Sequence, residues 1–119
     1  MTLNGAEERI VREVTKWDGV VASPHRFGGT EFRLGRRELG HTHGDHQADI
    51  PFPMSVRNQL IAEGKAEPHH IMPQSGWITF RLKKEGDIEL AVDLFKLSYE
   101  LANKRAGKAS SKDPQNLNS

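Results

Sequence analysis

Two alternating segments separated by a two-residue break constrain the fold more than any other feature. In residues 30–34 apolar side chains alternate with charged ones, and residues 37–43 alternate in the same way, with Gly35-Arg36 between them. Two alternating runs joined by two residues, one of them glycine, predict an antiparallel β-hairpin. A hairpin of this kind needs further strands or a helix layer to bury its apolar face.

The register of this hairpin follows from counting outward from the turn. Counting places Arg33 opposite Glu38 and Phe32 opposite Leu39, so that opposite charges pair on one face and apolar side chains on the other. In this register the two histidines near the end of the second strand share the face of Leu39. They are therefore expected to point toward the packed side of the sheet or the rim of a cleft.

The rest of the chain supplies more strands and three helices. Asn4 and Glu7 have the spacing of a capping box, and Pro53 and Gly64 suit the start and the end of a second helix. Apolar spacing predicts helices at 5–16, 53–63 and from Asp87 to about 106, with strands at 20–22, 47–52, 66–72 and 77–82. This order predicts an α+β fold: a compact two-layer domain with a curved antiparallel sheet and helices packed on one face.

Length and composition limit the classes of protein that remain. The 119 residues fit one domain, expected at 1–106, and residues 107–119 have too little apolar content to fold and are expected to be disordered. The net charge of +1 gives no general case for nucleic acid or membrane binding, and the absence of cysteine excludes a disulfide scaffold. Without a signal pattern or a long apolar run, we expect a soluble, cytoplasmic protein.

The segment HTHGDH carries the densest set of metal-ligand side chains. Two imidazoles at i and i+2 on a strand share a face, so His41 and His43 can reach one ion, and Asp45 and His46 follow where the chain turns. Imidazole and carboxylate suit a divalent metal such as zinc, and also iron or nickel. One alternative that the sequence indicates is therefore a metal-dependent hydrolase or oxygenase whose ligands are His41, His43 and either Asp45 or His46.

The same six residues resemble the metal motif of the metallo-β-lactamase superfamily. That resemblance implies one zinc on His41 and His43 and a second on Asp45 and His46. The fold of that superfamily needs about twice this length and further ligands downstream, which this chain lacks.

A second prediction is a cleft that binds a small ligand or a peptide. From strand register and spacing, the residues predicted to line this cleft are His41, His43, His69, His70 and Trp77. Because adjacent residues of a strand face opposite sides, we expect only one of His69 and His70 to join the site.

A third alternative is a nucleic-acid-binding module. Its candidate residues are basic side chains at or near the hairpin tip: Arg26, Arg33, Arg36 and Arg37. Such a tip can sit on phosphates, but the nearly neutral chain and the Glu38 partner of Arg33 count against it.

Several blocks of the chain resemble the luciferase domain family of small bacterial proteins. The blocks begin at Trp17 and extend to Glu100: WDGV, HRFGGTEFRLGRRELGHTHGDHQADIPFP, VRNQLIAEGKAEPHHIMPQSGWITFRL and LFKLSYE. The resemblance assigns neither a catalytic residue nor light emission to this chain. The second half is also similar to MmcQ/YjbR-like proteins, which implies a compact α/β fold with a curved antiparallel sheet. DNA binding has been suggested for such folds.

Overall fold

The part of the chain that the structure describes forms a six-stranded antiparallel sheet and three helices. The computed structural model describes residues 4–25 and 28–111, with side chains as far as Lys104. The strands lie in the order β1-β2-β3-β4-β6-β5, with every neighbouring pair antiparallel. Along the chain the elements are α1 (Ala6–Val14), β1 (Val20–Pro24), β2 (Thr30–Leu34), β3 (Arg37–His43), β4 (Gln47–Pro51), α2 (Met54–Ala62), β5 (Glu67–Pro68), β6 (Trp77–Arg81) and α3 (Gly86–Ser111).

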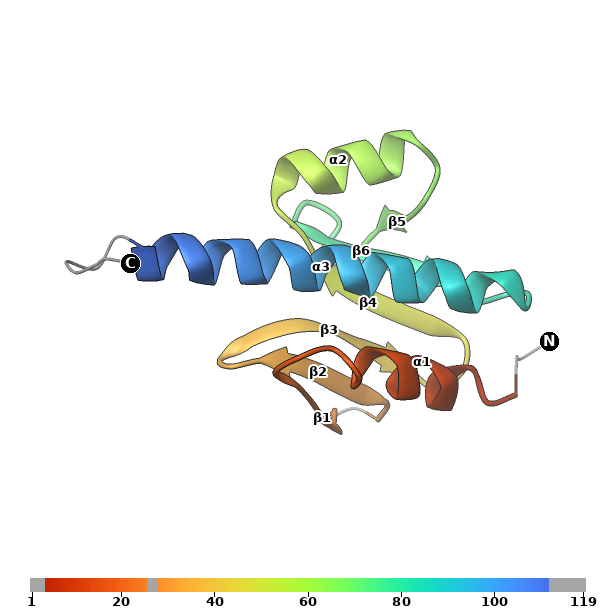
Figure 1. Ribbon diagram of the computed structural model, residues 1–119. Coiled ribbons are helices and arrows are strands. Elements are labelled where there is room, and N and C mark those ends of the chain that lie inside the picture. Colours follow the sequence, from red (N-terminus) through yellow and green to blue (C-terminus); the bar gives the residue numbers. More distant parts are fainter. Residues whose placement is uncertain (1–3, 26–27, 112–119) are drawn as a thin grey trace.

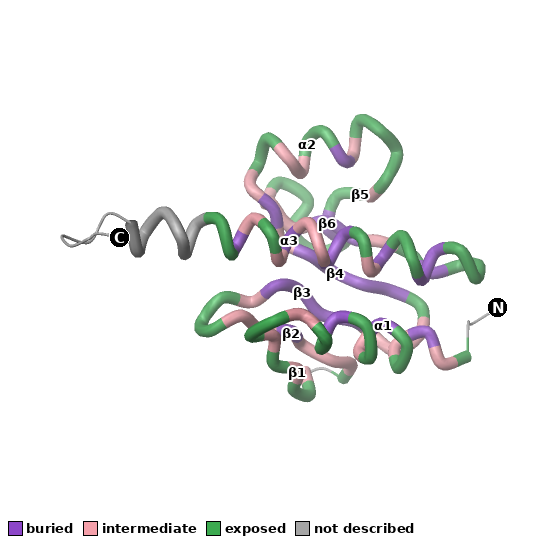
Figure 2. Tube along the Cα trace, viewed as in Figure 1, coloured by how far each residue is buried: buried purple, intermediate pink, exposed green. Residues whose placement is uncertain are grey.

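The hydrophobic core lies between the sheet and the helix layer, as the predicted α+β class requires. Helices α1 and α3 run across one face of the sheet (Figure 1), and buried residues concentrate in β3, β4 and the helix surfaces turned toward them (Figure 2). Phe32 of β2 and Phe95 of α3 are both fully buried, and their rings meet edge to face at 5.1 Å between centroids. The α+β fold with helices on one face is confirmed.

The N-terminus of α1 is capped from a distant part of the chain and not by the expected capping box. Gly5 is the N-cap residue and provides no side-chain cap, whereas the carboxylate of Asp45 accepts hydrogen bonds from the backbone N–H groups of Gly5 and Glu7 at 3.1 and 2.8 Å. The carboxylate of Glu7 instead accepts hydrogen bonds from two threonine hydroxyls, on β2 and β3. An anion at a helix N-terminus is stabilising, so the β3–β4 turn docks onto α1.

A β-bulge in β3 changes the register predicted for the hairpin. Arg33 pairs with Glu38 as predicted, but Phe32 pairs with Gly40 and not with Leu39. Leu39 is fully buried in the core, and a Cβ atom placed on Gly40 would lie 2.8 Å from Cε1 of Phe95, so both residues face the helix layer. The side chains that follow Gly40 in β3 consequently point to the opposite face of the sheet from the one predicted. The prediction that His41 and His43 share the face of Leu39 is wrong.

Two other elements differ in extent from the sequence prediction. The strand expected at 66–72 is a strand only at Glu67–Pro68, and the next four residues turn instead of extending. Helix α3 continues to Ser111, past the start of the tail expected at 107–119, whose residues 112–119 lie outside the described part of the chain. No helix in residues 4–25 and 28–111 combines the length and the apolarity needed to cross a bilayer.

The bulge gives a stability prediction. Gly40→Ala should lower the free energy of unfolding by about 1–3 kcal/mol, because its φ of 139° disfavours a side chain and the new methyl group would overlap Phe95 and the Asp49 carbonyl. Gly64→Ala is the matched control, since Gly64 also has a positive φ (73°) but open space around it. Urea denaturation measures both variants. Equal losses for the two would contradict the close packing inferred at the bulge.

Candidate functional site

The open face of the sheet, opposite the helices, is centred on Asp49 of β4. Asp49 pairs with His41 on one neighbouring strand and with Thr79 on the other, and its side chain is completely buried. Its Oδ1 atom accepts hydrogen bonds from the Thr79 hydroxyl at 2.9 Å and from Nε2 of Gln47 at 3.3 Å. Gln47 is held in turn by Nη1 of Arg81, which donates to its side-chain carbonyl at 2.9 Å.

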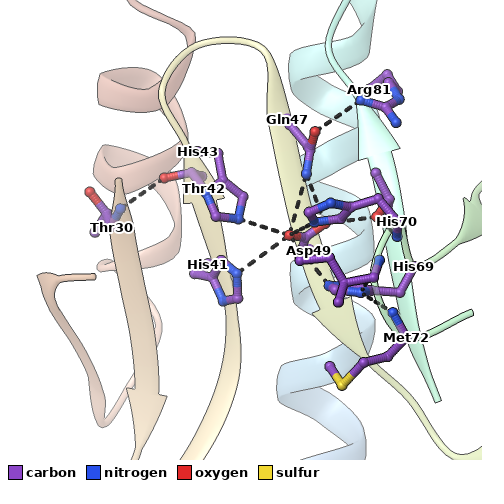
Figure 3. Close-up of polar contacts among 12 residues, drawn as sticks. Thr30, His41, Thr42, His43, Gln47, Asp49, His69, His70, Met72 and Arg81 are labelled. Atoms are coloured by element: carbon purple, nitrogen blue, oxygen red, sulfur yellow. Dashed lines mark hydrogen bonds and ion pairs between the residues drawn. The ribbon is translucent and has the colours of Figure 1, made fainter. Parts of the chain in front are cut away.

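Four histidines converge on the other oxygen of this carboxylate. The distances from Nε2 to Oδ2 of Asp49 are 2.9 Å for His43, 3.1 Å for His70, 3.4 Å for His41 and 3.6 Å for His69. Figure 3 shows the imidazoles approaching Asp49 from β3 on one side and from the segment after β5 on the other. The two histidine clusters, 26 residues or more apart in sequence, therefore form one site.

The remaining ring nitrogens of two of these histidines show where their protons lie. Nδ1 of His41 is 2.7 Å from a carboxylate oxygen of Glu38, so this nitrogen carries a proton and donates it to Glu38. Nδ1 of His69 accepts hydrogen bonds from the backbone N–H groups of Ile71 and Met72 at 3.2 and 3.0 Å. In His69 the proton therefore lies on Nε2, which points at Asp49.

Burial and the central carboxylate act on the pKa values of the site in opposite directions. Burial disfavours the charged form of His41, but the carboxylates of Asp49 and Glu38 outweigh it and raise its pKa to about 9. Burial also works against the charge of Asp49, yet hydrogen bonds from His41, Thr79 and His70 hold its pKa well below the usual range. For His43 and His69 burial dominates and lowers the pKa, which favours neutral imidazoles.

One group of these side chains has the arrangement of a metal-binding triad. The ligand atoms of His41, His43 and Asp49 all lie within 4.8 Å of one another. A second group, Asp49 with His69 and His70, meets the same distance limit. In that second group, however, the proton on Nε2 of His69 occupies the position that a metal ion would need. A third group, His25 with Glu38 and His41, meets the limit as well, but there Nδ1 of His41 donates its proton to Glu38. In the triad of His41, His43 and Asp49, Nε2 of His41 becomes a donor for an ion once it loses the proton that its raised pKa implies.

A cavity of about 210 Å³ opens directly over this cluster. All five residues predicted for the cleft line it: His41, His43, His69, His70 and Trp77. Five residues that were not predicted line it as well: His25, Glu38, Asp49, Ile71 and Met72. The ring of His25 stacks on that of His41 with centroids 4.0 Å apart. Both His69 and His70 join the site, contrary to the expectation for adjacent strand residues, because this segment turns after β5 ends at Pro68.

The other predicted ligands lie apart from the cluster. Asp45 binds the N-terminus of α1. His46 is exposed beside a neighbouring hollow of about 440 Å³, which His43 and His70 of the cluster also line. The HTHGDH segment therefore divides after its second histidine: His41 and His43 face the cavity, while the carboxylate that joins them comes from Asp49 on the next strand.

The basic residues of the nucleic-acid alternative surround the hairpin tip. Arg33 forms an ion pair with Glu31 and donates to the backbone carbonyl of Arg36, and Arg36 and Arg37 are exposed. Arg26 lies outside the described residues.

Sequence reasoning missed three ionisable side chains of the site, Glu38, Asp49 and His25, besides the apolar Ile71 and Met72. The sequence did indicate Asp49, because this aspartate lies between Ala48 and Ile50 in a segment predicted to be a strand. A carboxylate in the middle of an inner strand is buried only when it has partners. Glu38 was read as the partner of Arg33, and His25 lies outside the motif that drew attention.

Comparison with known proteins gives one match. The family model described as Luciferase domain matches residues 36–98, from the hairpin tip into α3. The matched region contains the triad, Glu38, both downstream histidines and Trp77, whereas His25 precedes it. No curated protein and no solved structure matches.

The pKa shifts predict how the stability of the metal-free protein changes with pH. His41, with its raised pKa, stabilises the folded state fully below pH 6.5, and this contribution is lost as the pH rises through about 9. His43 and His69, with lowered pKa values, stabilise it above pH 6.5 and lose this contribution as the pH falls. Urea denaturation in chelator should therefore show a maximum near pH 6.5 and a loss of roughly 1–3 kcal/mol toward pH 9.

The control for this prediction is His41→Gln, which keeps a polar side chain of similar reach but does not titrate. Its free energy of unfolding should be nearly constant between pH 6.5 and 9. If the wild type and this variant lost stability in parallel over that range, the role assigned to His41 would be refuted.

Proposed function

The chain belongs to the luciferase domain family, and we propose that it is a metal-dependent enzyme that acts on a small molecule at a mononuclear centre. The ligands of the divalent ion are Nε2 of His41, Nε2 of His43 and the carboxylate of Asp49. One observation carries the proposal: four imidazole nitrogens approach a single oxygen of a fully buried carboxylate within 3.6 Å.

Hydrogen bonds alone account poorly for this convergence. A carboxylate oxygen offers about two lone pairs, and His43 and His70 occupy those of Oδ2 at 2.9 and 3.1 Å. Nε2 of His41 and Nε2 of His69 nevertheless lie 3.4 and 3.6 Å from the same oxygen. If all four imidazoles were charged, their mutual repulsion in a buried setting would be severe, and burial favours the neutral form of His43 and His69. A cation between the nitrogens and the carboxylate removes this conflict, because neutral imidazoles then present lone pairs to it.

The distances within the triad suit ligands of one ion. Ligand atoms about 2.0–2.1 Å from a metal ion lie about 3.4 Å apart in tetrahedral and about 2.9 Å apart in octahedral geometry. The Nε2 atoms of His41 and His43 lie 3.4 and 2.9 Å from Oδ2 of Asp49. A small movement of the side chains therefore suffices to admit the ion.

The surrounding side chains orient these ligands. Glu38 accepts the Nδ1 proton of His41, the carboxylate–histidine pairing that commonly supports metal-bound imidazoles. Thr79 binds Oδ1 of Asp49, and Nε2 of Gln47 lies between the two carboxylate oxygens, 3.3 Å from Oδ1 and 3.4 Å from Oδ2. Nε2 of His70 lies 3.1 Å from Oδ2 on the side away from β3, where it holds the carboxylate in place.

Two histidines and one carboxylate leave coordination positions free, and the cavity lies over them. An open position is the mark of a catalytic centre, because substrate or water binds there. With zinc such a centre activates water for hydrolysis, and with iron(II) the two-histidine, one-carboxylate set supports oxygenase chemistry. The small-ligand cleft and the metalloenzyme, separate alternatives from sequence, thus become one function.

Ligand replacement tests the centre. Protein purified without chelator should contain about one divalent ion per chain, and His43→Ala and Asp49→Asn should each lose most of it, because each removes a donor from a three-residue set. Elemental analysis, followed by titration of stripped protein with Co²⁺ and Zn²⁺ in a calorimeter, measures both content and affinity. Retained iron would favour oxygenase assays, and retained zinc hydrolase assays.

The matched controls are Asp45→Asn and His46→Ala, which alter the two motif residues that lie apart from the cluster. Both should bind metal as the wild type does. Metal loss in these variants but not in Asp49→Asn would overturn the ligand set, and a stripped protein that binds neither ion would overturn the metal centre itself.

The supporting carboxylate of Glu38 gives a graded prediction. Glu38→Gln should keep one binding site per chain but weaken metal affinity by about 10–100-fold, since it removes the charged acceptor of the His41 Nδ1 proton. Glu31→Gln changes a neighbouring carboxylate whose ion-pair partner is Arg33, and should leave metal affinity unchanged. Calorimetric titration with Zn²⁺ compares the two, and equal affinities would show that Glu38 does not orient the ligand.

A further inference from the structure

The cavity over the proposed centre has an apolar wall beside its polar floor. Ile71 is 74% exposed and Met72 is 46% exposed, and both line the cavity that the triad closes from below. Trp77 lines it as well. Single exposed apolar side chains are ordinary, but two adjacent ones at the mouth of a cavity over candidate metal ligands indicate an apolar ligand.

These two side chains are held in position by the backbone beneath them. The N–H groups of both residues donate to Nδ1 of His69, and the Ser75 hydroxyl donates to the Met72 carbonyl at 2.7 Å. The N–H of His70 donates to the Thr79 hydroxyl at 3.3 Å, which ties the same segment to β6. The segment is therefore fixed at several points in a conformation that presents Ile71 and Met72 to solvent beside the cavity.

Trp77 continues the apolar surface down to the metal ligands. Its ring lies 5.4 Å from that of His41 and 6.0 Å from that of His69, between centroids. No lysine or arginine is among the described residues that line this cavity. A phosphate or a second carboxylate on the ligand would thus find no lysine or arginine there, and an uncharged apolar body would find a matching surface.

We propose that the ligand of this site is an amphipathic small molecule. Its polar end carries oxygen donors that bind the ion, and its apolar body packs against Ile71, Met72 and Trp77. This inference rests on the proposed metal centre, because the ion fixes the polar end. It adds the chemical class of the ligand and identifies Ile71 and Met72 as residues that determine specificity.

Two hydroxamates that differ only in their apolar part test the proposal. Acetohydroxamate and benzohydroxamate bring the same pair of oxygen donors to the metal, one with a methyl and the other with a phenyl group. Titration of the Co²⁺-loaded full chain, followed by the visible absorption of cobalt, gives both dissociation constants. Benzohydroxamate should bind at least about tenfold more tightly, the range expected for added apolar contact in a pocket.

A double variant locates that preference in the wall. Ile71→Ser combined with Met72→Ser should bring the ratio of the two dissociation constants close to one, while the Co²⁺ content stays at one per chain. Leu90→Ser is the matched control: Leu90 is also exposed (51%) but lies on α3, across the sheet from the site, and its replacement should leave the ratio unchanged.

The outcomes separate the two proposals. A chain that takes up no Co²⁺ refutes the metal centre. A chain that takes up Co²⁺ but binds both hydroxamates equally refutes the apolar ligand while leaving the centre intact. A double variant that keeps the wild-type preference, or that changes only the oligomeric state in size-exclusion chromatography, overturns the assignment of Ile71 and Met72 to a small-molecule site.

Discussion

The burial of Asp49 is the interaction on which the arrangement of the open face depends. A completely buried carboxylate is costly unless charged or hydrogen-bonding groups surround it. Thr79 and Gln47 satisfy one oxygen, and the imidazoles of β3 and of the segment after β5 surround the other. Because these partners come from three separate parts of the chain, Asp49 links the register of the central strands to the conformation of the segment that carries Ile71 and Met72.

The bulge at Gly40 makes this arrangement compatible with a packed core. Without an extra residue in β3, the alternation that buries Leu39 would also turn His41 toward the helix layer and away from Asp49. With Leu39 and Gly40 both on the helix side, the strand inverts and its histidines reach Asp49. Glycine fits here because Phe95 and the Asp49 carbonyl leave no room for a Cβ atom. The same residue therefore serves the core and the site.

The sequence predicts the features that depend on local patterns. It does not predict the features that depend on segments distant in sequence meeting in the fold. Alternation and turn chemistry gave the hairpin, the register of Arg33 opposite Glu38 and the α+β class, because side-chain periodicity directly encodes the buried face. The predicted charge pair is wrong, because Arg33 forms its ion pair with Glu31 and Glu38 accepts a hydrogen bond from His41. Counting residues from a turn cannot detect a bulge, so the sheet face predicted for His41 was wrong. Nor does any local pattern reveal that His70 lies beside β4, since that proximity depends on β6 inserting between β4 and β5.

The two aspartates near the histidine motif show that the acid nearest in sequence need not be the acid nearest in space. Asp45 lies in the β3–β4 turn, where its carboxylate accepts hydrogen bonds from the N–H groups that begin α1, a position that stabilises a negative charge. Asp49 sits on the next strand, directly opposite His41 and on the same face. An antiparallel turn brings residues opposite each other according to register and not to sequence order. Two histidines on one strand therefore meet a carboxylate across the turn, while the acid nearest in sequence caps the helix on the other face of the sheet.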